Sequence, residues 1–175
     1  MTKRILTTAL MMIAMMGVAQ AHPDHGHVIG LLHGFMHPLS GWDHIVAMVA
    51  VGFFAATLGG RALWAVPSTF VLMMVAGGAW GMAGMPLPFV EIGIMTSVVV
   101  LAGVALLRWN ASLYSAMALC GFFAVFHGYA HGAEMPTEAS GLTYALGFIL
   151  ATSLLHIAGL AVGMIAARRK SAQQA

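Results

Sequence analysis

The sequence predicts an all-α integral membrane protein, a compact bundle of about five transmembrane helices. Of its 175 residues, 61% are hydrophobic and only 7% are charged, whereas soluble domains carry about 25% charged residues. The mean hydropathy is correspondingly high, at +0.92. The hydrophobic residues form long runs separated by glycine, proline or arginine, so most of the chain is expected to lie in the lipid bilayer. Seven scattered basic residues argue against nucleic-acid binding.

The N-terminus has the three parts of a secretory signal peptide. Lys3 and Arg4 are basic, residues 5–18 are apolar, and the chain then reads Ala-Gln-Ala up to Ala21. We expect residues 1–21 to be cleaved off. An uncleaved signal anchor is the alternative, but the apolar run is shorter than the about 20 residues that a span needs. Residues 22–39 then form a periplasmic, His-rich entrance segment with a short half-helix.

The spans can be placed from the apolar runs and their interruptions. Pro38 removes a backbone donor, so it is expected to kink or break the helix within the apolar run that contains it. The five predicted spans cover residues 41–58, 63–82, 89–107, 113–131 and 142–167. They form one transmembrane domain, residues 40–170, and a polar cytoplasmic tail follows at residues 171–175.

The positive charges predict the orientation of the bundle. If the mature N-terminus is outside, then Arg61, Arg108 and the basic cluster at 168–170 all fall on the cytoplasmic side. The loops on the other side, near Pro86 and near Glu134, carry no lysine or arginine. This distribution obeys the positive-inside rule. We therefore predict a multi-pass protein of the bacterial inner membrane, with its N-terminus in the periplasm and its C-terminus in the cytoplasm.

Glycines inside the predicted spans indicate close helix packing. Gly77 and Gly81 have the G-x-x-x-G spacing, as do Gly159 and Gly163. Small residues let helices approach closely in lipid, where apolar burial gives little driving force for association.

The first group of polar residues lies at the start of the first predicted span. His37 and His44 are separated by two helical turns, and Asp43 adjoins His44. Such groups are costly in a bilayer unless they pair, line a cavity or bind something. Imidazole and carboxylate are ligands of divalent transition metals. Asp43 can either bind the metal directly or orient an imidazole.

A second group lies at the end of the fourth predicted span. His127 and His131 have the i, i+4 spacing that lets two imidazoles meet one metal, and Glu134 follows. Residue 128 is glycine, so the general base of the H-E-x-x-H metalloproteases is missing. For the two groups to form one site, spans 41–58 and 113–131 are expected to pack side by side.

Two further residues remain open. Glu91 begins the third span and either faces water or supplies a third carboxylate to the metal path. His156 lies in the middle of the fifth span without an acidic neighbour in sequence.

The motif H-P-x-x-G-x-D-H at residues 37–44 and the motif F-H-G-x-A-H-G-x-E at residues 126–134 resemble those of the HupE/UreJ family of hydrogenase- and urease-accessory nickel permeases. The resemblance covers essentially the whole chain. It implies uptake of nickel, with cobalt as a second candidate, for hydrogenase or urease maturation. It also implies a metal path along His37, Asp43, His44, His127, His131 and Glu134.

The leading functional hypothesis is therefore a permease or facilitator, not an enzyme, with nickel(II) as transported substrate and no resident cofactor. The chain has no Walker-type phosphate loop, so its own use of ATP is not expected. The alternatives are a metal-dependent membrane hydrolase, in which a carboxylate serves as the base, and a metal-sensing accessory protein. The sequence leaves the oligomeric state open.

Overall fold

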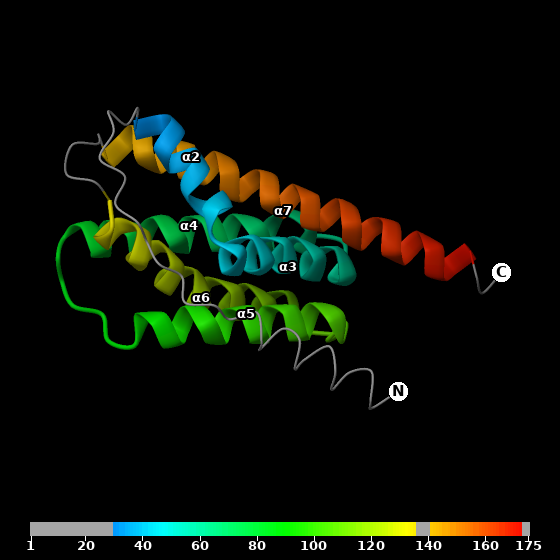
Figure 1. Cartoon of the computed structure of the whole chain (residues 1–175). Coiled ribbons are helices and arrows are strands. Elements are labelled where there is room, and N and C mark those ends of the chain that lie inside the picture. Colours follow the sequence, from blue (N-terminus) through cyan, green and yellow to red (C-terminus); the bar gives the residue numbers. More distant parts are fainter. Residues whose placement is uncertain (1–29, 136–140, 173–175) are drawn as a thin grey trace.

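The computed structural model describes residues 30–135 and 141–172, with side chains as far as residue 168. Within these ranges all regular secondary structure is helical, which confirms the predicted fold class. Figure 1 shows the helices, which are α2 (Gly30–Ser40), α3 (Trp42–Leu58), α4 (Ala62–Met82), α5 (Val90–Leu106), α6 (Leu113–Ala133) and α7 (Gly141–Ala172). The predicted signal peptide and the histidines before residue 30 lie outside the described residues, as does the end of the tail.

The helix in the first apolar run is broken, but not at the proline. Pro38 lies inside α2, and the break falls at Gly41, whose φ of −102° and ψ of 119° are extended. Ser40 Oγ donates to the carbonyl oxygen of His37 at 2.6 Å and so satisfies one carbonyl at the helix end. A proline removes only one backbone donor, so the helix continues for two residues beyond it. The axes of α2 and α3 differ by 84°.

Five of the helices match the five predicted spans closely in their bounds. By length and composition, α4, α6 and α7 are each able to cross a membrane, and the bent pair α2–α3 is a fourth candidate. The fifth helix, α5, is apolar but has 17 residues, which gives a length of about 25 Å at 1.5 Å per residue. The molecule is thus a multi-pass helical membrane protein.

The predicted packing of the first and fourth spans side by side is wrong. Helix α6 packs along α4, whereas α3 and α2 pack along α7. Helix α3 contacts α6 only over a short stretch. Figure 1 shows α2 lying against the first half of α7. The reason lies in the glycines. At Gly77 and Gly81 of α4 and at Gly128 of α6, an added Cβ would overlap the backbone of the other helix.

Gly77 and Gly81 therefore fulfil the predicted role of close helix packing. Gly159 and Gly163 do the same in α7, where an added Cβ would meet Val49 and Phe53 of α3. At these glycines the backbones of neighbouring helices approach so closely that a larger residue would not fit.

Replacing Gly128 by alanine is expected to destabilise the fold by about 1–3 kcal/mol, because the new methyl group must push α6 away from Met74 of α4. Thermal unfolding in detergent measures the effect. Gly103→Ala is the matched control, since nothing lies within 4 Å of a Cβ at that position. Equal unfolding temperatures for the two variants would contradict the packing argument.

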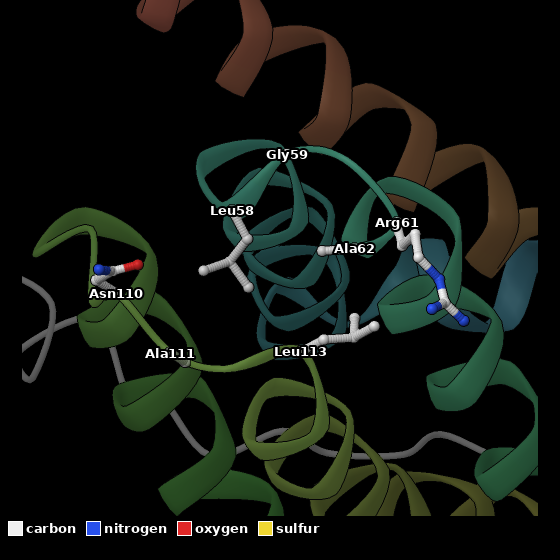
Figure 2. A pocket seen from close by; sticks show the side chains of 7 residues that line it. All are labelled: Leu58, Gly59, Arg61, Ala62, Asn110, Ala111 and Leu113. Atoms are coloured by element: carbon white, nitrogen blue, oxygen red, sulfur yellow. The ribbon is translucent and has the colours of Figure 1, made fainter.

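The two ends of the bundle differ in chemistry. Helices α3 and α6 carry His44 and His131 at one end. At the other end, the turn after α3 and the loop before α6 surround a hollow of about 300 Å³. Figure 2 shows the residues that line it, which include Leu58, Arg61 and Leu113. The predicted cytoplasmic arginine Arg61 thus lies at the end opposite to the histidines.

Candidate metal site

Four histidines come together where α2, α3 and α6 meet. The bend between α2 and α3 brings His37, near the end of α2, close to His44, in the first turn of α3. His127 and His131 lie on one face of α6 in its last two turns, because residues four apart share a helix face. The ring of His131 lies between the others, with its centroid 4.7 Å from that of His37 and 4.3 Å from that of His44.

The outer part of the cluster consists of His37, His131 and Glu134. Each offers one ligand atom within 4.8 Å of the other two. His37 Nε2 lies 3.9 Å from Glu134 Oε2. His131 is only 6% exposed, whereas the Glu134 side chain is 48% exposed. We call these three residues the outer group. The outer group therefore reaches from the surface into the bundle.

The inner part of the cluster is centred on Nε2 of His44. This nitrogen lies 2.9 Å from His127 Nδ1 and 2.5 Å from His131 Nε2. One ring nitrogen offers either one hydrogen or one lone pair, so it cannot make a full hydrogen bond to both partners. Three imidazoles that direct nitrogens at one another in this way form a set suited to binding a cation.

Ser97 of α5 orients the ring of His127. Its hydroxyl donates to the carbonyl oxygen of Ile94 at 2.6 Å. The hydroxyl oxygen is then left to accept from His127 Nε2, also at 2.6 Å. The hydrogen of His127 is therefore on Nε2, and the lone pair of Nδ1 points at His44.

Asp43 has the corresponding role for His44. Its Oδ1 lies 3.4 Å from His44 Nδ1, so the carboxylate favours a hydrogen on that nitrogen and a lone pair on Nε2. A carboxylate or hydroxyl that holds the outer ring nitrogen in this way is typical of metal-binding histidines. Of the two roles that the sequence left open for Asp43, this geometry favours orienting an imidazole.

Glu91 stands apart from the others. It lies in the first turn of α5 and is exposed, and it makes no contact with the histidines. It acts at a distance instead. Burial raises the pKa of Glu134, which follows the end of α6, and the charge of Glu91 raises this pKa further. The structure thus brings together six of the seven candidate residues and leaves Glu91 as an electrostatic neighbour.

Sequence reasoning did not find Ser97. A weak signal exists, because Thr96 and Ser97 are the only hydrogen-bonding side chains between Glu91 and Arg108. Such a residue usually bonds to its own helix, so its position alone does not indicate a partner. The contact with His127 depends on the packing of α5 against α6.

These features define the class of protein, a multi-pass helical membrane protein with a buried cluster of histidines that opens through a carboxylate to the surface. The chain belongs to the HupE/UreJ family, because the family model described as HupE / UreJ protein matches residues 9–175. It is also 42% identical over 160 residues to Protein HupE of Rhizobium leguminosarum bv. viciae, which covers 91% of this chain and 83% of that protein. No solved structure matches.

Proposed function

We propose that this protein is a permease for nickel(II) in the bacterial inner membrane. The observation that carries the proposal is the row of ligand groups from the half-exposed Glu134 through His131 and His44 to the fully buried His127. A structural metal ion is held by one closed set of protein ligands. Ligands in series, each able to take the ion from the last, suit an ion that moves.

The choice of metal and its destination rest on the family. Neutral imidazoles and carboxylates suit nickel, copper, zinc and cobalt in general. Membership of the HupE/UreJ family narrows the proposal to nickel, with cobalt as a second candidate, and to supply of hydrogenase or urease maturation.

We infer the orientation from the chemistry of the two ends of the bundle. With the arginine end in the cytoplasm, the outer group faces the periplasm. The membrane potential then draws a cation inward, by about 2.3 kcal/mol per charge for each 100 mV. Nickel(II) carries two charges, so no ATP-binding domain is needed for uptake.

Purified protein in liposomes tests the proposal directly. Nickel added outside is expected to enter and quench a metal-sensitive dye inside, faster when the interior is negative. Asn110→Ala, at the opposite end of the bundle, is the control and should transport normally. Absence of uptake together with metal-dependent hydrolysis would instead favour the enzyme alternative.

Ser97→Ala is expected to weaken nickel binding by roughly 10–100-fold, because His127 loses the partner that fixes its hydrogen on Nε2. Equilibrium binding to purified protein measures the change. Ser97→Thr keeps a hydroxyl and should recover much of the affinity. Equal affinities for the alanine variant and the unaltered protein would contradict the role of Ser97.

The raised pKa of Glu134 predicts the pH dependence of binding. A carboxyl group binds metal only when it is deprotonated. As the pH falls, Glu134 takes up a proton at a higher pH than an ordinary glutamate does, so binding begins to weaken earlier. We therefore expect nickel uptake to slow as the pH falls through the raised pKa of Glu134.

Glu91→Gln isolates the contribution of Glu134. The Glu91 charge is the second cause of the raised Glu134 pKa, after burial. Removing this charge should therefore move the loss of nickel binding to lower pH. Glu91→Asp keeps the charge and serves as the control. Identical pH profiles for the glutamine variant and the unaltered protein would refute this coupling.

A further inference from the structure

His156 is a buried histidine outside the cluster described above. It lies in the middle of α7 and is 2% exposed. Neither of its ring nitrogens has a hydrogen-bond partner in the described part of the chain. Buried polar groups in proteins are normally hydrogen-bonded, and leaving one without a partner is costly. We therefore expect His156 to bind a partner transiently.

Two other atoms that can serve as metal ligands lie near His156. Thr152 is one helical turn before His156 on the same face of α7, and it is fully buried. Its hydroxyl donates to the Sδ atom of Met74 on α4 at 3.9 Å. Met74 is one turn after Phe70, whose ring lies edge-on to His156 with centroids 5.3 Å apart. The interface of α4 and α7 thus gathers an imidazole, a hydroxyl and a thioether.

Phe70 connects this place to the histidine cluster. Its ring centroid is 6.0 Å from that of His127, the deepest residue of the cluster, and 5.3 Å from that of His156. The ring is fully buried. One aromatic side chain therefore lies near both the inner end of the cluster and His156.

The core-facing side of α7 links the same two places. Tyr144, Phe148, Thr152 and His156 recur every four residues, and all are buried. Phe148 packs on His131 with ring centroids 4.3 Å apart, so the stripe begins at the cluster. It ends at His156, two turns nearer the arginine end.

We propose that His156, with Met74 and Thr152, forms a second binding site for the transported divalent cation, separated from the histidine cluster by the ring of Phe70. This inference rests on the proposed permease. All three donors are neutral, and a nitrogen–sulfur pair suits borderline transition metals better than magnesium or calcium. Without a carboxylate the site binds weakly, which allows the ion to leave.

His156→Leu tests the inner site, because it removes the unpaired nitrogens and fills the buried position with an apolar side chain. Nickel uptake into liposomes is expected to lose about tenfold in maximal rate, with the half-saturating nickel concentration unchanged, since the outer group is intact. The unfolding temperature should stay equal or rise, because a buried group without partners is removed. Leu101→Met, a volume-conserving change in the core, is the control and should leave the maximal rate, the half-saturating nickel concentration and the unfolding temperature unchanged.

A second measurement examines the ligands themselves. X-ray absorption of nickel bound to the His44→Ala, His131→Ala double variant, in which both the inner cluster and the outer group are disabled, is expected to show a sulfur neighbour that disappears when Met74→Leu is added. Absence of sulfur from the first spectrum would overturn the inner site.

The uptake results separate the two proposals. Normal uptake by the unaltered protein and by His156→Leu would overturn the inner site and leave the permease standing. A lower unfolding temperature of His156→Leu with full uptake would assign the residue to packing and likewise overturn it. No uptake by the unaltered protein would contradict the permease, and the sulfur signal would then decide the inner site by itself.

Discussion

Replacing His44 by alanine is expected to abolish nickel uptake while leaving the protein inserted in the membrane. Both His127 Nδ1 and His131 Nε2 approach the same nitrogen of His44, so its loss interrupts the row at its centre. The contacts of His44 are mainly with other members of the cluster, namely Asp43, His127 and His131, so folding should survive the change. Uptake of nickel into liposomes, at equal amounts of inserted protein, measures the effect.

Asp43→Ala should have nearly the same result, because the carboxylate holds the ring nitrogen of His44 that faces away from the row. Asp43→Asn distinguishes charge from hydrogen bonding, since its amide oxygen still accepts. Asn110→Ala again serves as the control. Normal uptake by His44→Ala would remove the basis of the proposed function.

Replacing His131 by alanine is expected to have the second large effect, loss of both nickel binding and uptake. His131 belongs to the outer group with His37 and Glu134 and also contacts His44, so it joins the surface to the buried part of the row. Equilibrium nickel binding and uptake should therefore fall together.

Cys120→Ala is the matched control for this change. Cys120 is on the same helix and is fully buried, and it belongs to the hydrophobic core rather than to the histidine row. Its alanine variant should bind and transport nickel normally. Retention of tight binding by His131→Ala would show that the outer group and the buried histidines are not one path.

Local residue patterns were sufficient to predict the helices. The apolar runs and the glycines, prolines and arginines between them gave bounds close to those of α4, α5 and α6, because a helix in lipid must satisfy its own backbone hydrogen bonds whatever its neighbours are. The kind of ligand was predictable for a similar reason. Imidazoles and carboxylates at membrane depth are too costly to be incidental.

Which helices pack together was not predictable from the spans alone. The expectation that the first and fourth spans lie side by side failed, although the residues they carry do meet. Gly77 and Gly81 were correctly assigned to close packing, but their spacing does not name the partner helix, which is α6. The backbones of α3 and α6 have few contacts, but the imidazole side chains of His44 and His131 extend far enough to meet between them.

The sequence by itself determined the helical membrane fold, the helix bounds and the six residues that gather at one end of the bundle. Only the tertiary structure decided their order in a row, the orienting role of Ser97, the separation of Glu91 and the alignment of His156 behind Phe70. The physical reason is range. Helix formation and the cost of burying a polar group depend on nearby residues, whereas the direction of a ring nitrogen is set by hydrogen-bond partners on other helices.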